Sequence, residues 1–289
     1  MARALRPDSA FLRRLAYAGA RFGPRFVVEY SPKFFGTAFA LALPETRSRV
    51  LRNLRRVKGQ RDFLSEQRDV VKTFTSYAAC FAESLGIERS DARETELVVH
   101  GEDHLKSVLA AHKGAILVTG HIGPWDCAAR LLARNLSADV VVVMLAEPDE
   151  RARELQDAVR ERTGVRVLHV GEHPLDSLPL LRHVRKGGVL AIQLDRAAPG
   201  GRSLEVEMFG GPEQLPEGPF RLAALSGAPI LPIFAHRVGY YRYEFSVEAP
   251  IWIPRAASGP ELRTAAAAAA RCIESFILRH PTEWFHFAN

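Results

Sequence analysis

The sequence predicts an α/β protein with a central, mostly parallel mixed sheet that helices cover on both faces. Short apolar runs such as residues 139–145 (DVVVVML) are bounded by polar turns, as in strands that are buried on both faces. Amphipathic segments of helical length separate these runs. The two alternate from about residue 96 to residue 194, and this order is typical of β-α-β units that form a parallel sheet.

The first 61 residues carry a different signal. They hold 14 Lys/Arg and three Asp/Glu, a net charge of +11, whereas the whole 289-residue chain has a net charge of +6. Apolar and basic residues interleave over residues 8–61, and the apolar run at 34–44 is shorter than the roughly 20 residues of a membrane-spanning helix. We expect residues 1–61 to form a basic amphipathic helical region that faces an anionic membrane surface. The alternative is a helical pair packed on the domain with its arginines in water.

Residues 62–289 are expected to form one domain. Apolar side chains at spacings of one to four predict a long first helix at 62–85. Strands are expected at 96–100, 115–119, 139–145, 165–170 and 188–194, with helices at 102–112, 125–135, 149–163 and 175–186 between them. The same patterns predict strands at 204–209, 230–238 and 243–247 and helices at 218–226 and 261–279. The late strands are expected to make the sheet partly antiparallel.

The loop after the 115–119 strand carries the candidate chemistry. Ligands of an α/β sheet bind beyond the carboxyl ends of its strands, and the sequence GHIGPWD places His121 and Asp126 there. Asp126, in the first turn of the next helix, could accept a hydrogen bond from one imidazole nitrogen and leave the other as a base. The loop has no Ser or Cys, so the pair is suited to activating a hydroxyl or water from outside. The alternative is a structural histidine beside a helix-start acid.

Residues 120–126 resemble the G-H-x-G-N-W-E/D signature of the lipid A biosynthesis (lauroyl/myristoyl) acyltransferases. That family includes the phosphatidylinositol mannoside acyltransferases and belongs to the wider lysophospholipid and glycerol-phosphate acyltransferases. Further matches follow in the family's order: 193–196 (QLDR), 206–211 (VEMFGG), 215–229 (LPEGPFRLAALSGAP) and 280–284 (HPTEW). Pro124 stands where the family has Asn, and Ala146-Glu147-Pro148 stands where lipid A enzymes have Arg-Pro. The Asp195-Arg196 pair is closer to the mannoside branch.

The resemblance implies an O-acyltransferase that moves a fatty acyl chain from an acyl thioester to a hydroxyl of a lipid or glycolipid. His121 would be the general base and Asp126 its orienting partner. Substrate contacts are expected from Gly123, Trp125, Asp195, Arg196, Glu217 and Arg221. The alternatives are a surface ion pair between Asp195 and Arg196 and a helix-start acid at Glu217.

The same resemblance implies no metal and no cofactor, with acyl carrier protein or coenzyme A carrying the acyl donor. It implies a peripheral enzyme on the cytoplasmic face of a bacterial inner membrane. Two other functions remain open. One is a catalytically altered, membrane-associated lipid-binding homologue, and the other is a metal-dependent hydrolase with ligands from His121, Asp126, His169 and Asp195. The three cysteines match no zinc spacing, and no zinc-finger, helix-turn-helix or RNA-recognition signature predicts nucleic-acid binding.

Overall fold

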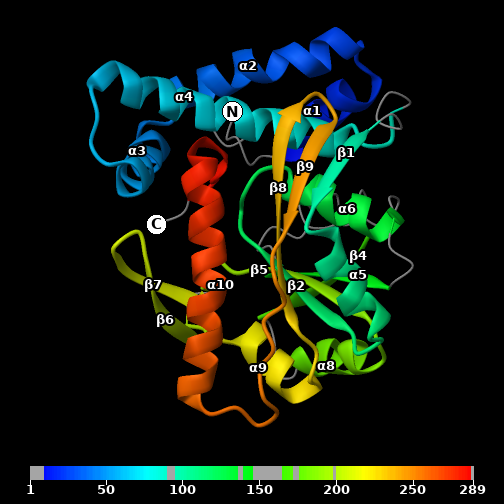
Figure 1. The fold of residues 1–289 in the computed structure, drawn as a ribbon. Helices are drawn as coiled ribbons and strands as arrows, with labels where there is room; N and C mark the ends of the chain where they lie inside the picture. Colours follow the sequence, from blue (N-terminus) through cyan, green and yellow to red (C-terminus); the bar gives the residue numbers. More distant parts are fainter. Residues whose placement is uncertain are drawn as a thin grey trace.

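The computed structural model describes residues 10–89, 95–135, 139–145, 165–171, 176–197 and 200–287. It confirms the predicted fold class, because a seven-stranded sheet lies among helices (Figure 1). The strand order is β1-β9-β8-β2-β5-β3-β4, and the β8–β9 pair alone is antiparallel within this sheet of described strands. The bounds are β1 (Glu96–His100), β2 (Ala115–Thr119), β3 (Val140–Leu145), β4 (Arg166–Val170), β5 (Val189–Gln193), β8 (Ile230–Gly239) and β9 (Arg242–Val247).

Strand β2 is in the middle of the sheet. Its residues pair in parallel with β5 on one side and β8 on the other, for example Ile116 with both Leu190 and Ile230. The run from Ala115 to Val118 is fully buried, which explains why its sequence is apolar at every position rather than at every second one. The loop that follows β2 therefore starts from the most constrained part of the sheet.

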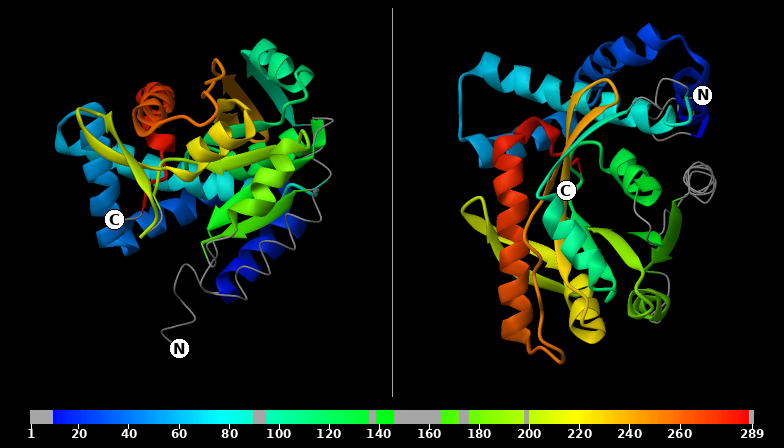
Figure 2. Two further views of the ribbon diagram at one scale, coloured as in Figure 1. Left: turned by 90° about the horizontal axis from the view of Figure 1, so that it is seen from below. Right: turned by 45° about the vertical axis from the view of Figure 1, so that its right-hand side comes forward.

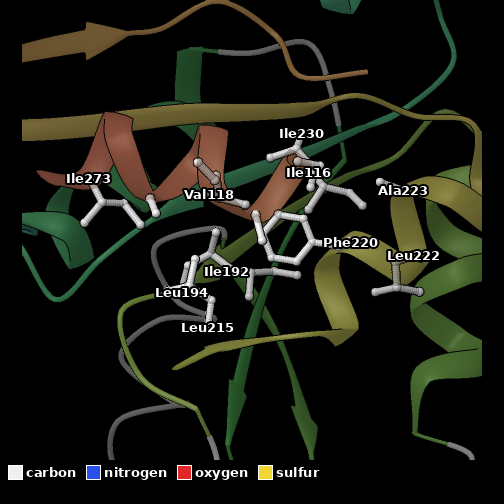
Figure 3. Close-up of a cluster of buried hydrophobic side chains, with 14 of the residues drawn as sticks. Ile116, Val118, Ile192, Leu194, Leu215, Phe220, Leu222, Ala223, Ile230 and Ile273 are labelled. Carbon is white, nitrogen blue, oxygen red and sulfur yellow. The ribbon is translucent and has the colours of Figure 1, made fainter. Parts of the chain in front are cut away.

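Helices cover both faces of the sheet, as predicted. Side chains alternate along a strand, so Ile116 and Val118 face one layer while Ala115 and Leu117 face the other. The first layer contains α9 (Gly218–Ser226) and α10 (Gly259–Arg279), and Figure 3 shows Phe220 and Ile273 from these helices in the same cluster as Ile116 and Val118. The second layer contains α5 (Glu102–Ala110) and α6 (Trp125–Asn135), and α8 (Ser177–Arg185) packs beside β5 and α9.

Four helices form a layer across one end of the sheet (Figures 1 and 2). They are α1 (Ala10–Phe22), α2 (Arg25–Ala42), α3 (Pro44–Lys58) and α4 (Phe63–Leu85). Helix α2 lies against α4, and Gly36 permits the contact, because a Cβ there would be 2.6 Å from Thr75 Cα and 2.8 Å from Phe74 O. The expected boundary at residue 61 falls in the turn between α3 and α4. Across the described part of the chain, no helix has both the length and the apolar composition to cross a bilayer.

A buried ion pair joins this helical layer to the sheet. Glu83 of α4 accepts hydrogen bonds from Arg237 Nε (2.8 Å) and Nη2 (2.6 Å) of β8, and from the hydroxyl of Tyr243 (2.6 Å) of β9. Burial raises the pKa of Glu83, and the charge and hydrogen bonds of Arg237 oppose that rise. Helix α4 is thereby fixed to the end of the β8–β9 hairpin.

One element in the second half of the chain departs from the expected set. The segment after β6 (Ser203–Met208) was not expected to be a strand, yet β7 (Gly211–Pro216) pairs with β6 in a separate two-stranded sheet. Its sequence, GPEQLP, has two prolines and little apolar character, which hides it from a search for periodicity. The helix expected at 149–163 and the sequence Ala146-Glu147-Pro148 lie outside the described residues, so the structure does not test them.

Candidate active site

Three segments meet beyond the carboxyl ends of β2 and β5. They are the loop 120–124 after β2, residues 194–196 after β5, and residues 280–287 after α10, which we call the C-terminal strap. Thr119 and Gln193, the last residues of the two strands, are register partners. Because the strands are parallel neighbours, the residues two positions further on, His121 and Asp195, emerge side by side.

His121 and Asp195 are directly hydrogen bonded. His121 Nδ1 lies 2.8 Å from Asp195 Oδ1, and the backbone N–H of His121 donates to the same oxygen at 3.0 Å. An ionised carboxylate only accepts hydrogen bonds, so Nδ1 carries the proton. Nε2 is then the nitrogen with a free lone pair, on a side chain that is 27% exposed. This arrangement suits a general base.

The Asp195 carboxylate is held in its ionised form. Its side chain is only 2% exposed, and burial alone would raise its pKa. The charge and hydrogen bonds of His121 and the charge of Arg196 outweigh burial and hold the pKa of Asp195 well below its usual range. A charged carboxylate at this position stabilises the imidazolium that forms when His121 takes a proton.

Asp126 was the expected hydrogen-bonding partner of His121, whereas the carboxylate bonded to His121 Nδ1 in the structure is that of Asp195. Asp126 lies in the first turn of α6, where its Oδ2 accepts a hydrogen bond from Arg130 Nη2 at 2.9 Å, one helical turn further on. The same guanidinium donates to the carbonyl of Ser84 in α4. The side chain of Arg130 is 5% exposed. Asp126 thus neutralises a buried arginine that joins α6 to α4.

The C-terminal strap closes over the loop. The backbone N–H of Gly123 donates to Glu283 O at 2.9 Å, and that of Phe285 donates to His121 O at 2.8 Å. Trp284 pairs with Ile122 in a β-bridge, and its indole N–H donates to Asp195 Oδ2 at 3.1 Å. The sequence HPTEW was predicted to matter as part of a family resemblance, but the contact between Trp284 and Asp195 was not foreseen.

Gly123 and Pro124 determine the shape of the loop. Gly123 has φ of +55°, and a Cβ there would lie 2.1 Å from Ala235 O, so no other residue fits. Pro124 is buried, and its carbonyl accepts the hydrogen bond from Ala128 N that opens α6. Proline suits a helix start because it needs no intrahelical N–H partner.

Trp125 contacts the ring of His121 and also lines an apolar pocket. The two rings are 6.2 Å apart between centroids and meet edge to face. The pocket lies between α6 and the β2, β3, β5, β8 and β9 strands, and its space, including the opening, is about 520 Å³. Its lining is apolar except for Thr119 and Gln193: Leu117, Trp125, Ala128, Val142, Val143, Ala191, Ile192, Ile233, Phe234, Ala235 and Phe245.

Arg196 also lies in this cluster, half-buried next to Asp195. Its Nη2 donates a hydrogen bond to Phe285 O of the strap at 2.6 Å. The guanidinium of Arg196 therefore bonds to the strap, rather than forming the surface ion pair with Asp195 that was the alternative. Burial lowers the pKa of Arg196, and the charge of Asp195 opposes this. His286 lies nearby and was not predicted from the sequence. Its pKa is lowered, mainly by burial and to a smaller extent by the charge of Arg196. His286 follows the matched HPTEW motif by two residues and belongs to no sequence motif itself, so the sequence did not identify it.

Glu217 and Arg221 are placed differently. Glu217 is buried at the start of α9. Its Oε1 accepts a hydrogen bond from Arg221 Nε (2.8 Å) and forms an ion pair with Arg221 Nη2 (2.6 Å). This pair is local to one helical turn and is not in the hydrogen-bonded cluster around His121. The structure therefore supports the helix-start interpretation of Glu217 more than a ligand contact.

The metal-site alternative gains no support from the described residues. Among them, no group of three or more His, Cys, Asp or Glu side chains is arranged to hold a metal ion. Of its four candidate ligands, His121 and Asp195 are hydrogen bonded to each other and Asp126 is bonded to Arg130. The fourth, His169, lies in β4 at the edge of the sheet.

Comparison with known proteins agrees with the motifs. The sequence profile described as "Bacterial lipid A biosynthesis acyltransferase" matches residues 3–289. The chain is similar to a protein named "Phosphatidylinositol mannoside acyltransferase" from Mycobacterium tuberculosis (strain CDC 1551 / Oshkosh), with 34% identity over 146 residues, 50% of this chain and 45% of that protein. A protein of the same name from Mycolicibacterium smegmatis (strain ATCC 700084 / mc(2)155) is 28% identical over 186 residues, 63% of this chain and 60% of that protein. The chain thus spans about half the length of the curated relatives it matches. All are acyltransferases by name, in agreement with the enzyme class predicted from the sequence.

Proposed function

Because the chain belongs to the bacterial lipid A biosynthesis acyltransferase family, we propose that it transfers a fatty acyl chain from an acyl thioester to a hydroxyl of a lipid or glycolipid. The observation that carries the proposal is the hydrogen bond between His121 Nδ1 and the buried Asp195 carboxylate. It leaves Nε2 as a base on an accessible side chain, beside an apolar pocket.

In the proposed reaction, His121 Nε2 takes the proton of the acceptor hydroxyl as its oxygen attacks the thioester carbonyl carbon. Asp195 stabilises the resulting imidazolium. The tetrahedral intermediate then collapses, the C–S bond breaks, and the departing thiolate takes the proton back from His121. The products are the new ester and a free thiol, and the enzyme returns to its starting protonation state.

The acyl chain of the donor would occupy the apolar pocket beside Trp125. Leu117, Ala191, Ile233 and Phe245 of its lining are on neighbouring strands and face α6 together. The lining of the pocket favours a hydrocarbon over a polar head group. Thr119 and Gln193, its polar residues, are at the strand ends, two positions before His121 and Asp195.

Arg196 would bind an anionic group of the donor or the acceptor next to the reacting atoms. The Nε of Arg196 and the Nδ1 of His286 are buried and have no hydrogen-bond partner among the described residues. Both atoms belong to side chains in electrostatic contact with the His121–Asp195 pair. Guanidinium groups suit phosphate and carboxylate oxyanions, which supports Arg196 as the residue that binds the anionic group.

The lipid would reach the site from a membrane that α2 contacts. Phe26 (65% exposed), Tyr30 (56%) and Phe34 (71%) follow one another at four-residue spacing and form one stripe, with Phe22 (77%) and Leu41 (67%) near its ends. Arg25 and Lys33 lie next to the stripe in sequence. Because α2 lies on the outer side of α4 (Figure 1), this stripe is available to a bilayer interface. We therefore propose peripheral binding to an anionic membrane, on the cytoplasmic face of the inner membrane.

The acceptor class follows from the relatives. Their printed name makes a phosphatidylinositol mannoside their acceptor, and the Asp195-Arg196 sequence favours that branch over enzymes of lipid A. We propose a glycolipid with a free sugar hydroxyl and an anionic head group as the acceptor. No metal and no cofactor is proposed, and the acyl carrier, whether acyl carrier protein or coenzyme A, is the donor substrate.

The test is acyl transfer from palmitoyl-coenzyme A to a glycolipid extract, followed by release of free thiol and by mass spectrometry of the lipids. The wild-type protein is expected to transfer, and His121→Ala to lose transfer while keeping its thermal unfolding temperature. Full activity of His121→Ala would overturn the mechanism. Lipid binding without thiol release, from coenzyme A and acyl carrier protein donors alike, would favour the catalytically altered homologue. Metal-dependent hydrolysis would favour the hydrolase.

A further inference from the structure

Trp284 holds the oxygen of Asp195 that His121 does not use. The indole Nε1–H donates to Asp195 Oδ2 at 3.1 Å, and Trp284 is 7% exposed. The other oxygen, Oδ1, accepts from the ring Nδ1 and the backbone N–H of His121. Each oxygen of this buried carboxylate therefore has its own donor.

The backbone of Trp284 is fixed relative to the same histidine. On one side of it, Glu283 O accepts from Gly123 N (2.9 Å), and on the other, Phe285 N donates to His121 O (2.8 Å). Trp284 itself pairs with Ile122. Because the backbone of the strap is hydrogen bonded on both sides of Trp284 to the loop that carries His121, the indole N–H points at Asp195 from a defined position.

A carboxylate that is held by one oxygen can still turn about its Cβ–Cγ bond. A donor on the second oxygen opposes this rotation, and hydrogen bonds to an ionised group are stronger than those between neutral groups. If the carboxylate turned, His121 would lose the acceptor that keeps its proton on Nδ1, and the base would spend part of its time as the wrong tautomer.

We propose that Trp284 is a positioning residue, whose indole N–H orients the Asp195 carboxylate so that it holds His121 with the proton on Nδ1. The inference rests on the proposed function, in which Nε2 of His121 is the base. It adds a third member to the His121–Asp195 pair, supplied by the C-terminal strap rather than by a strand end.

The first experiment needs no substrate. Imidazole ¹⁵N chemical shifts, assigned by comparison with His121→Ala, report which ring nitrogen of His121 carries the proton. The wild-type protein is expected to show the Nδ1–H tautomer, and Trp284→Phe a mixture of tautomers. Two controls apply. Trp252→Phe removes an exposed indole, and Phe209→Leu removes the ring that packs 5.4 Å from Trp284 but leaves its N–H. Both controls are expected to retain the Nδ1–H tautomer.

The second experiment is a double-mutant cycle on transfer from palmitoyl-coenzyme A to the glycolipid extract. Trp284→Phe is expected to lower kcat about tenfold with little change in KM, the loss expected for a hydrogen bond to a charged group. In the Asp195→Asn background the same change is expected to cost less than about twofold, because Trp284 acts through Asp195.

The proposal would be overturned if Trp284→Phe lowered kcat by the same factor in the wild-type and Asp195→Asn backgrounds. It would also be overturned if the His121 tautomer were unchanged in Trp284→Phe. Either result would mean that Trp284 only packs. A tautomer change in Trp284→Phe together with full transfer by His121→Ala would have a different meaning: the positioning contact would stand and the proposed function would fail. If Trp284→Phe does not fold, Trp284→His, which keeps an N–H donor on a smaller ring, replaces it in both experiments. It is expected to retain more of the Nδ1–H tautomer and of kcat than Trp284→Leu, and equal losses in these two variants would contradict the role of the N–H.

Discussion

His121 and Asp195 are 74 residues apart in the chain, yet a 2.8 Å hydrogen bond joins their side chains. The contact follows from the sheet, since β2 and β5 are parallel neighbours in a register that ends both strands at the same level. The carboxylate that orients the histidine thus comes from the next strand and not from the helix that follows the histidine in sequence.

Replacing each of the two carboxylates separately distinguishes their roles. Asp195→Asn is expected to lower kcat on the order of 10²–10⁴-fold, because the general base loses the group that orients it. Asp126→Asn is expected to lower kcat far less and to destabilise the fold by about 1–3 kcal/mol, because Arg130 loses its carboxylate. Steady-state transfer kinetics and urea unfolding measure the two effects. Equal kcat losses in the two variants would restore Asp126 as the orienting partner.

The stability of the fold is expected to depend on Asp195 in acid. Its pKa is held below the usual value near 3.8 by His121 and Arg196, so the folded state binds this proton less readily than the unfolded state. The stabilisation is therefore complete above about pH 5 and is lost as the pH falls below about 4. Thermal unfolding from pH 3 to pH 7 should show the wild-type protein's advantage over Asp195→Asn shrinking toward low pH. A difference that does not change with pH would contradict the ionised carboxylate.

The buried pair between α4 and β8 is expected to be a major stabilising contact. Glu83→Gln leaves the partly buried Arg237 without a charged partner and is expected to cost about 3–5 kcal/mol in the free energy of unfolding. The matched control is Glu102→Gln, which breaks the exposed pair with Lys106 and should cost less than about 1 kcal/mol. Urea unfolding of both variants provides the comparison, and similar costs would mean that the buried pair contributes no more than a surface pair.

Membrane binding is expected to depend on the α2 stripe. The double variant Phe26→Ser, Phe34→Ser should lose vesicle affinity by more than about tenfold, since each phenyl ring contributes about 1.5–3 kcal/mol when it leaves water. Its thermal stability should be unchanged because both rings are exposed in the fold. Flotation with vesicles of anionic phospholipid measures the affinity, which should also fall with added salt.

The control is Leu225→Ser, Leu278→Ser, which removes exposed apolar side chains from α9 and α10. It should bind vesicles as the wild-type protein does. Equal losses in the two double variants would show that α2 has no special part in docking. Binding by the wild-type protein that does not respond to salt would remove the electrostatic contribution of the basic N-terminal region.

The loop 120–124 is expected to tolerate no side chain at Gly123. Gly123→Ala would bring a Cβ against Ala235 O in a backbone conformation with positive φ, so transfer activity should be lost and the unfolding temperature lowered. Gly211→Ala is the control, since a Cβ there meets nothing within 4 Å and its φ is not positive. Activity equal to that of the wild-type protein in Gly123→Ala would show that the loop can rearrange without loss.

The elements that the sequence predicted well are those with strong local patterns. Strand β2, helix α6 and helix α9 have the bounds expected from their apolar periodicity, and β8 differs at its end by one residue. The loop at 120–124 was located correctly because glycine and proline mark both its turn and the start of α6.

The partners within the site could not be predicted in the same way. The short spacing along the chain suggested Asp126 as the hydrogen-bonding partner of His121. In the structure, Asp195 is bonded to His121 because β5 lies next to β2, and no local sequence pattern reveals that strand order. Strand β7 is held by its pairing with β6 and not by its own propensity. The role of Trp284 depends on a contact with a residue 89 positions away.

The separation of these residues along the chain also has a kinetic consequence. The site combines contacts that span 74 and 89 residues, and contacts of such long range form late because loop closure must precede them. The His121–Asp195–Trp284 arrangement therefore exists only when β2, β5 and the C-terminal strap have all docked. During refolding from denaturant, helical signal should return before the Nδ1–H tautomer of His121, and a compact chain that lacks the docked strap should be catalytically silent.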